Sequence, residues 1–294
     1  MFKGSLVALV TPMTDDGAID ERRWRELLAW HQVAGTAGVV VAGTTGESAT
    51  LTEKEFIRLV EIARDTLAGR IPVIAGTGFP STAQSIERTG LAARLGADAA
   101  LVVTPAYNRP SQRGLLAHFR AVADASALPV ILYNVPSRTA VDLLPETSLE
   151  LARHPNIVAI KEAVGDPTRV LKLVAGGLDV LSGDDSSCCE SLLSGACGVI
   201  SVAANVAPET FARMGRLALD RQIDQARALN AALQDLYPFL SIEANPVPVK
   251  WLLFRMGRIG DHLRLPLVSL DARFRNQADM LIAALKLDRA VDVA

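Results

Sequence analysis

The chain has 294 residues, half of them hydrophobic, with a formal net charge of −2 and a pI near 6.1. This length suits one large domain or two smaller ones. The slight acidic excess disfavours nucleic acid as a partner, because such sites gain affinity from clustered lysine and arginine. No apolar run approaches the roughly 18–20 residues that cross a bilayer, so the sequence predicts no membrane partner.

The N-terminal stretch MFKGSLVALVTPM contains a lysine and a short apolar core. That core, LVALV, is shorter than the roughly 7–15 residues of a secretory signal, and no A-x-A site follows it. We therefore expect a first strand here and a cytoplasmic protein.

Short apolar runs alternate with amphipathic segments along the chain. The runs predicted to be strands are SLVALVTP, AGVVVAGTTGE, IPVIAGTG, ADAALVVTPAY, LPVILYNVP, NIVAIKEA, LDVLSGDD and GVISVAANV. The segments predicted to be helices are 21–34, 53–68, 82–95, 115–125, 145–153, 167–174, 186–193 and 208–219. Two of them begin with cap signals: Thr52 and Glu55 match a capping box, and Asp166 precedes Pro167 at a first helical position.

Eight strands and eight helices in strict alternation predict an α/β fold, a (β/α)8 TIM barrel. The strands are continuously apolar, which indicates burial on both faces. A doubly wound open sheet is the alternative, but VTPMTDDG after the first strand lacks its glycine-rich turn. Beyond residue 220, helices are predicted over 221–237, 245–257 and 270–286. We assign residues 1–221 to the barrel catalytic domain and 222–294 to a C-terminal helical domain.

The three cysteines, Cys188, Cys189 and Cys197, fall within ten residues, and the four histidines are scattered. An odd, clustered count is a poor disulfide framework, and neither C-x-x-C nor H-E-x-x-H occurs. We predict no metal site and regard the cysteines as small, partly buried residues in a reducing compartment.

The stretch NIVAIKEAV places Lys161 inside an apolar run. Burying a lysine costs free energy unless a partner or a reaction uses it. Alternate residues of a strand share a face. The alternation predicts one face made of Ile157, Ala159, Lys161 and Ala163, and an opposite face made of Val158, Ile160 and Glu162.

By the same count Tyr133 shares a face with Ile131 on the preceding strand. If these faces are the barrel interior, Lys161 and Tyr133 project from neighbouring strands at the face where barrel enzymes place their sites. Burial lowers the pKa of a lysine from about 10.4, and the neutral amine attacks carbonyl carbon. A tyrosine can then protonate the carbinolamine oxygen, with Thr44 and Tyr107 as candidates for a proton relay.

Two groups suit anionic substrates. The GTTG turn presents backbone N–H groups and the hydroxyls of Thr44 and Thr45 to a carboxylate. Arg138 offers a planar fork for a second carboxylate. Together they predict a pocket for a 2-oxo acid and another anion.

Each of these residues also has a structural interpretation. Lys161 alone could reach solvent, Tyr133 alone could be a core tyrosine, and GTTG alone could be a tight turn. Asp184 and Asp185 are expected to cap the next helix rather than bind a cation. Glu47 is expected to accept backbone hydrogen bonds below the site. The joint occurrence of reactive groups at strand ends favours an active site.

Several motifs resemble those of the dihydrodipicolinate synthases, which belong to the pyruvate-dependent class I aldolase and N-acetylneuraminate lyase family. They run in order through the chain: GSLVALVTPM, GTTGESATL, RIPVIAGTG, YNRPSQ, ILYNVPSRT, DLLPET, IKEA, LSGDD, GVISV and NPVPVKW. The two threonines of TTGE and the arginine of YNVPSRT resemble the synthases rather than the N-acetylneuraminate lyases.

The resemblance implies a lyase of lysine (diaminopimelate) biosynthesis that condenses pyruvate with L-aspartate 4-semialdehyde. Lys161 would form an imine with pyruvate, so no separate cofactor and no metal are implied. Tyr133 would be the general acid and base, with Thr44 and Tyr107 as its relay, Tyr107 reaching across a dimer interface.

The resemblance also implies binding roles and an assembly. Thr45, Ile200 and Gly183 would bind pyruvate, and Arg138 would hold the carboxylate of the semialdehyde. A homotetramer built from two tight dimers is expected. The segment 174–180 is shorter than in some relatives, so a dimer is the alternative.

The family's lysine-binding cleft is altered in this chain. Ser48 and Ala49 are retained. The other expected positions hold Glu53, Phe56, Pro80, Gln84 and Ala106, where lysine-inhibited members carry mostly histidine, asparagine, glutamate and tyrosine. We therefore predict weak or absent inhibition by lysine.

Two other functions remain open. One is a related pyruvate-dependent aldolase that acts on another aldehyde or a sugar acid, which Arg138 and the Thr44–Thr45 pair disfavour. The other is a catalytically silent barrel that binds or regulates, which the presence of every reactive side chain disfavours.

Overall fold

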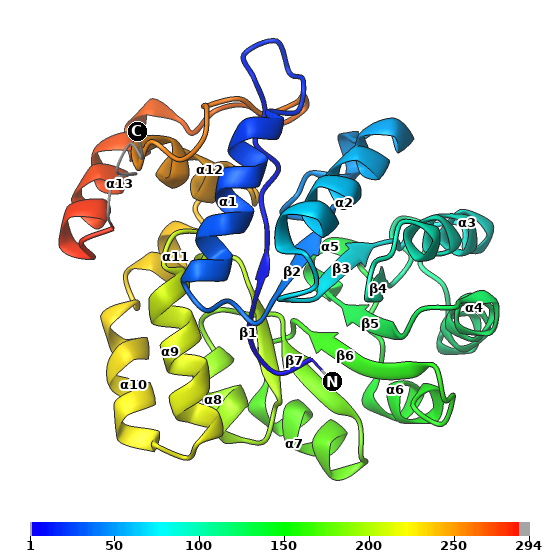
Figure 1. Ribbon diagram of the computed structural model, residues 1–294. Helices are drawn as coiled ribbons and strands as arrows, with labels where there is room; N and C mark the ends of the chain where they lie inside the picture. Colours follow the sequence, from blue (N-terminus) through cyan, green and yellow to red (C-terminus); the bar gives the residue numbers. More distant parts are fainter. Residues whose placement is uncertain (1, 288–294) are drawn as a thin grey trace.

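Eight parallel strands close into a barrel in the computed structural model, which describes residues 2–287 (Figure 1). The strands are β1 (Gly4–Ala8), β2 (Gly38–Val41), β3 (Val73–Gly76), β4 (Ala99–Val103), β5 (Val130–Asn134), β6 (Ile157–Glu162), β7 (Asp179–Ser182) and β8 (Gly198–Ser201). Each strand pairs with the next along the chain, and β8 pairs with β1. The predicted (β/α)8 barrel is confirmed.

Helices follow the strands and surround the barrel (Figure 1). They are α1 (Glu21–Val33), α2 (Glu53–Leu67), α3 (Thr82–Arg94), α4 (Gln112–Ala125), α6 (Pro145–Leu151), α7 (Pro167–Ala175), α8 (Cys188–Leu193) and α9 (Pro208–Leu219). The capping box of α2 and the Asp166 cap of α7 form as predicted. Helix α4 begins three residues before the predicted start, because the Ser111 side chain accepts from the Gly114 N–H. The short helices α5 (Pro136–Thr139), η1 (Ser48–Thr50) and η2 (Ala203–Asn205) were not predicted.

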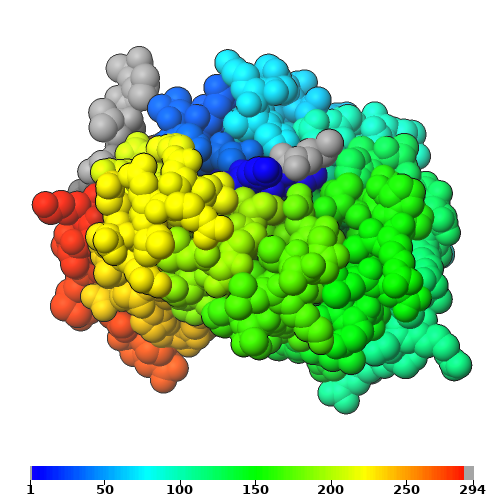
Figure 2. All heavy atoms as spheres, turned by 90° about the horizontal axis from the view of Figure 1, so that it is seen from below, coloured from blue at the N-terminus to red at the C-terminus, as the bar shows by residue number. Residues whose placement is uncertain are grey.

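The C-terminal segment contains α10 (Ile223–Ala232), α11 (Leu236–Phe239), α12 (Val247–Arg255) and α13 (Ala272–Ala284). The single helix predicted over 221–237 is wrong, since α10 and α11 are separate helices. Pro238 explains the break, because a proline ring clashes with the carbonyl four residues earlier in a continuous helix. Figure 2 shows the orange and red C-terminal helices beside the yellow α9 and α10 at one end of the molecule. The boundary between residues 221 and 222 stays a prediction, and residues 288–294 lie outside the described part.

Two apolar clusters form the core. The outer cluster lies between the strands and the helices and includes Trp24, Phe56 and Phe119. The inner cluster includes Leu6, Val40, Ile74, Leu101, Ile131, Leu181 and Ile200, together with Tyr133. Side chains therefore fill the barrel interior, as expected for this fold. Within residues 2–287, no helix combines the length and the apolarity needed to span a membrane.

A register shift corrects the predicted faces of β6. Val130 pairs with Ile157, but Ile131 pairs with Ala159, so one residue of β6 is unmatched. Ile157 consequently joins the outer cluster, and Val158 packs against the inner cluster. The predicted sides of Ile157 and Val158 are wrong, whereas Ala159 faces the interior as predicted.

Candidate active site

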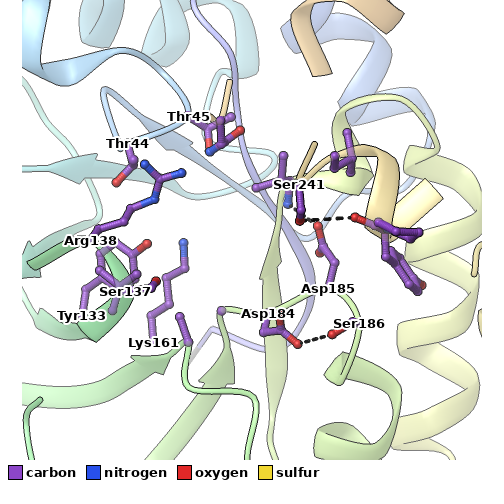
Figure 3. Close-up of a pocket in the computed structure, with 18 of the residues that line it drawn as sticks. Thr44, Thr45, Tyr133, Ser137, Arg138, Lys161, Asp184, Asp185, Ser186 and Ser241 are labelled. Carbon is purple, nitrogen blue, oxygen red and sulfur yellow. Dashed lines mark hydrogen bonds between the residues drawn. The ribbon is translucent and has the colours of Figure 1, made fainter. Parts of the chain in front are cut away.

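Lys161 and Tyr133 lie side by side where β6 and β5 end (Figure 3). The two residues are direct partners in the sheet register. The Lys161 Nζ lies 4.2 Å from the centre of the Tyr133 ring, and the residues are only 5% and 7% exposed. The predicted placement of this pair on neighbouring strands is confirmed.

The pair opens into a cavity of about 490 Å³ at the carboxyl ends of the strands. The cavity is lined by Thr44, Thr45, Tyr133, Val135, Ser137, Arg138, Lys161, Ala163, Gly183, Asp184, Asp185, Ser186, Val202, Gln234, Tyr237, Pro238, Leu240, Ser241 and Asn245. Six of the predicted site residues therefore share one cavity. The residues from Gln234 to Asn245 belong to the C-terminal segment and were not predicted.

Gly183 at the end of β7 leaves the space that Lys161 occupies. A Cβ atom at position 183 would lie 3.0 Å from Lys161 Cε, 3.1 Å from Lys161 Cγ and 2.8 Å from Ala163 Cβ. The contact with Ala163 is closer than real Cβ contacts, and those with Lys161 are tight enough that its side chain would have to shift. The glycine therefore leaves room for the Lys161 side chain in its present position.

Thr44 and Thr45 stand on the turn that follows β2. Both line the cavity, and the Thr45 Oγ1 accepts a hydrogen bond of 2.9 Å from Asn245 Nδ2. Asn245 lies 200 residues away in the sequence, so no local signal could predict this contact. The bond fixes the Thr45 side chain at the cavity wall.

Arg138 lies on α5, immediately after β5. Its side chain is directed across the cavity toward Thr44 (Figure 3). Among residues 2–287 it forms neither a hydrogen bond nor an ion pair through its guanidinium. The fork is therefore available to an anionic ligand.

Asp184 and Asp185 have different partners. The Asp184 Oδ2 accepts from the Ser187 N–H at 2.9 Å, in the turn before α8. The N-cap residue of α8 is Ser187, without a side-chain cap hydrogen bond, so Asp184 does not cap this helix as predicted. The Asp185 Oδ2 instead accepts from the N–H groups of Val202 and Ala203, so its predicted capping role is wrong. Burial raises the pKa of Asp185.

Glu47 has a partner that the sequence did not reveal. Its Oε2 accepts from the Arg264 backbone N–H at 3.2 Å, which agrees with the expected backbone hydrogen bonding. Its Oε1, however, forms an ion pair of 2.6 Å with Lys250 of α12, and both side chains are almost fully buried. Burial lowers the pKa of Lys250. Glu47 lies two residues after Thr45 in the chain, so the ion pair holds the turn that follows β2.

Two predicted site residues do not reach the cavity of the single chain. Tyr107, on the loop after β4, is 98% exposed. Ile200 lies on β8 in the inner cluster and is buried below the cavity. The predicted role of Tyr107 beside Tyr133 across a dimer interface stays a prediction.

Most positions of the predicted lysine-binding cleft, both retained and altered, border another cavity of about 280 Å³. Ser48, Ala49, Phe56, Pro80 and Ala106 line it together with Thr44 and Tyr133, whereas Glu53 and Gln84 line a smaller adjacent hollow. The Arg88 guanidinium lies 4.5 Å from the centre of the Phe56 ring and 5.1 Å from that of Phe79. This cavity is mainly apolar and carries a fixed positive charge.

The cysteines are free, and burial raises the pKa of all three thiols, that of Cys197 to about 11. Within residues 2–287 no group of three or more histidine, cysteine, aspartate or glutamate side chains could hold a metal ion.

Comparison with known proteins decides the family. The model of the dihydrodipicolinate synthetase family matches residues 1–285. The chain belongs to this family. It is 53% identical to a 4-hydroxy-tetrahydrodipicolinate synthase of Xanthomonas axonopodis pv. citri, over 96% of this chain and 94% of that protein. A 4-hydroxy-tetrahydrodipicolinate synthase of Saccharophagus degradans is 47% identical over 98% of this chain and 100% of its own length.

A solved structure agrees with both the sequence and the fold. The chloride-inhibited dihydrodipicolinate synthase of Acinetobacter baumannii, complexed with pyruvate, superposes with a TM-score of 0.96 at 44% identity. The match covers 98% of this chain and all of that one. The predicted family is confirmed, and the chain is a lyase of the dihydrodipicolinate synthase type.

Proposed function

We propose that the chain condenses pyruvate with L-aspartate 4-semialdehyde through an imine on Lys161. The observation that carries this proposal is the buried Lys161 amine against the Tyr133 ring, at the wall of a cavity that also holds Arg138. A desolvated amine beside a proton donor suits attack on a ketone carbon. A free guanidinium in the same cavity suits a dicarboxylate product.

The reaction balances without an added cofactor. The Lys161 amine adds to C2 of pyruvate, and the carbinolamine loses water to give the imine. Loss of a C3 proton gives an enamine, whose C3 bonds to the aldehyde carbon of the semialdehyde. The amine of the semialdehyde then attacks the imine carbon, closes the ring and releases the Lys161 amine. One water leaves for each product formed.

Tyr133 would transfer the protons of this sequence, since it is the proton donor closest to Lys161 in the register. Thr44 and the Tyr107 of a second subunit would connect its hydroxyl to solvent. Thr45 and Gly183 would border the pyruvate carboxylate, with the backbone of Ile200 below it. Arg138 would hold the carboxylate of the semialdehyde.

Replacement of Lys161 tests the proposal. The wild-type enzyme should consume both substrates and, with pyruvate and borohydride, gain a stable adduct on the peptide that contains Lys161. The Lys161→Ala variant should lose the adduct and at least about 1,000-fold in kcat, because covalent catalysis is lost. Lys172→Ala, which removes an exposed lysine of α7, is the control and should keep both the borohydride adduct and the wild-type kcat. Turnover by Lys161→Ala at the wild-type rate contradicts the proposal. Product from another aldehyde alone would favour the related aldolase.

We also propose that lysine inhibits this enzyme weakly or not at all. The ammonium group of lysine would meet an apolar wall of Phe56, Pro80 and Ala106 and the charge of Arg88. The carboxylates of Glu53 and Glu87, which line the adjacent hollow, already interact with Arg88. A lysine titration of the coupled assay should leave the rate nearly unchanged. Strong inhibition at submillimolar lysine contradicts this proposal.

Assembly and location belong to the same proposal. A homotetramer of two dimers, or a dimer alone, would bring Tyr107 of one subunit to the site of another. Light scattering after size exclusion distinguishes these states. A cytoplasmic location is supported by three free cysteines, which persist in reducing compartments.

A further inference from the structure

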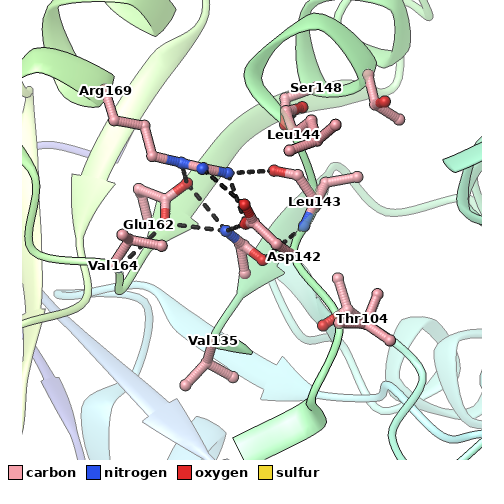
Figure 4. A network of polar contacts seen from close by, with 12 residues as sticks. Thr104, Val135, Asp142, Leu143, Leu144, Ser148, Glu162, Val164 and Arg169 are labelled. Carbon is pink, nitrogen blue, oxygen red and sulfur yellow. Dashed lines mark hydrogen bonds and ion pairs between the residues drawn. The ribbon is translucent and has the colours of Figure 1, made fainter. Parts of the chain in front are cut away.

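A cluster of four polar residues lies on the outer face of β5 and β6, away from the barrel interior (Figure 4). It consists of Asn134, Asp142, Glu162 and Arg169, and we refer to it as the outer polar cluster. None of the four lines the active-site cavity. Asn134 directly follows Tyr133, Glu162 directly follows Lys161, and Asn134 and Glu162 are partners in the register. Each reactive residue on the inner face therefore has a cluster residue next to it on the outer face.

Arg169 of α7 joins both carboxylates. Its Nε donates to Glu162 Oε2 at 2.7 Å, and its Nη1 and Nη2 donate to the two Asp142 oxygens at 2.9 and 2.8 Å. The guanidinium thus contacts Asp142 with the paired geometry that holds a planar carboxylate in one orientation. The Glu162 side chain is 1% exposed and that of Arg169 is 10% exposed.

Asn134 completes the cluster from its centre. Its Nδ2 donates to Asp142 Oδ1 at 2.8 Å and to the Glu162 oxygens at 3.0 and 3.2 Å. Its Oδ1 accepts from the Leu143 N–H at 2.9 Å. All the partners of Glu162 are donors, including the Val164 N–H at 3.1 Å. Only a carboxylate at position 162 can accept from all of them.

The cluster is costly for a purely structural element. It places two carboxylates against one guanidinium, and Glu162 and Arg169 are largely closed to water, where apolar residues of similar volume are often as stable. A polar arrangement of this kind specifies one geometry, because each member fits only with its partners in place.

The cluster also connects two parts of the active site. Glu162 holds the end of β6, which carries Lys161, through the Val164 N–H. Asp142 and Asn134 hold the segment after α5, the helix that carries Arg138, and Asn134 does so through the Leu143 N–H. Arg169 links the two.

We propose that Asn134, Asp142, Glu162 and Arg169 are positioning residues for the reaction. Glu162 sets the Lys161 amine for imine formation, and Asp142 sets Arg138 for the second substrate. This proposal rests on the proposed function. The cluster acts through the backbone of β5, β6 and α5, since it does not touch the cavity.

Two substitutions separate the positioning of Lys161 from the positioning of Arg138. Glu162→Gln turns an amide donor toward Arg169 Nε or Asn134 Nδ2, which are themselves donors. It should therefore slow borohydride trapping of pyruvate by about tenfold, because small displacements of a reacting group reduce the rate by that much or more. It should leave the KM for the semialdehyde within about twofold. Asp142→Asn should raise that KM by about fivefold and leave the trapping rate within about twofold. Arg169→Met should produce both effects.

Asp98→Asn is the matched control. Asp98 also pairs with an arginine, Arg64, at 2.7 Å, and accepts a backbone N–H from Val73. It precedes β4, at the opposite end of the strands from the cavity. This variant should lower the melting temperature without changing the trapping rate or the KM.

Two results would overturn the proposal. One is that Glu162→Gln and Asp142→Asn change only the melting temperature, as Asp98→Asn does. The other is that both lower every kinetic constant by one common factor, which indicates general destabilisation. The proposed function can fail independently of this proposal. If the wild-type enzyme traps pyruvate but does not consume the semialdehyde, the trapping rate of Glu162→Gln still tests whether Glu162 positions Lys161.

Discussion

Lys161 reaches the cavity through space that a side chain at position 183 would occupy. In the proposed reaction the amine supplies the chemistry, but its location depends on the absence of a Cβ atom on the residue after the neighbouring strand β7. The Tyr133 ring covers the other side of the amine at 4.2 Å. Reactivity at this residue is therefore set by what surrounds it, including one residue without a side chain.

Gly183→Ala should shift Lys161 and reduce kcat by at least about tenfold, because the new methyl group would lie 2.8 Å from Ala163 Cβ and 3.0 Å from Lys161 Cε. The rate of borohydride trapping with pyruvate measures the displacement directly. Gly90→Ala in α3 is the control, since a Cβ there would meet only Arg94 at 3.6 Å. It should stabilise the protein by about 0.5–1 kcal/mol and keep activity. Wild-type trapping by Gly183→Ala would show that Lys161 tolerates the methyl group.

Lys161 and Tyr133 could be located from the sequence because strand alternation is a local property. The contacts that hold the site are different. The Thr45–Asn245 bond spans 200 residues and the Glu47–Lys250 pair spans 203, so only the folded chain brings them together. Asp185 also shows this limit, since its acceptor role depends on backbone that follows β8.

Among the elements, the strands followed the predicted pattern more closely than the connections. Continuous apolar runs identified all eight strands, but the register shift at Val130 exchanged the sides of Ile157 and Val158. Helix α5 was missed because four residues are too short for a periodic signal. Helix α12 was predicted, yet its connection to the turn after β2 was not.

That connection is the buried pair of Lys250 and Glu47. Lys250→Met should leave the Glu47 carboxylate buried without its cation and lower the free energy of unfolding by about 3–5 kcal/mol. Urea unfolding measures the loss. The double variant Lys250→Met with Glu47→Gln should recover a large part of it, because no charge then remains buried.

An exposed pair provides the comparison. Arg227 and Glu190 also form an ion pair, but their side chains are 55% and 48% exposed. Arg227→Met should change the stability by no more than about 1 kcal/mol. A Lys250→Met variant as stable as Arg227→Met would mean that water or another group compensates Glu47.

For the whole molecule, one chain supplies the barrel and brings Lys161, Tyr133 and Arg138 to one cavity, but it leaves Tyr107 98% exposed. We propose that this exposed tyrosine completes a site on another subunit of a symmetric assembly. The loop that carries it follows β4, next to the strand of Tyr133. The assembly is therefore part of the catalytic proposal.

Hybrid dimers test whether Tyr107 acts between subunits. In a hybrid of Tyr107→Phe and Lys161→Ala chains, the chain with Lys161 receives Tyr107 from its partner, so one site of two is intact and about half of the wild-type activity should return. Wild-type chains paired with the Tyr107→Phe, Lys161→Ala double variant form the control. In that control the only site with a reactive lysine faces a partner loop that lacks the tyrosine hydroxyl, so activity should stay low. Differently tagged chains purified through both tags supply these hybrids. If Tyr107 instead serves its own chain, the two results exchange: the control keeps half of the activity and the first hybrid stays low.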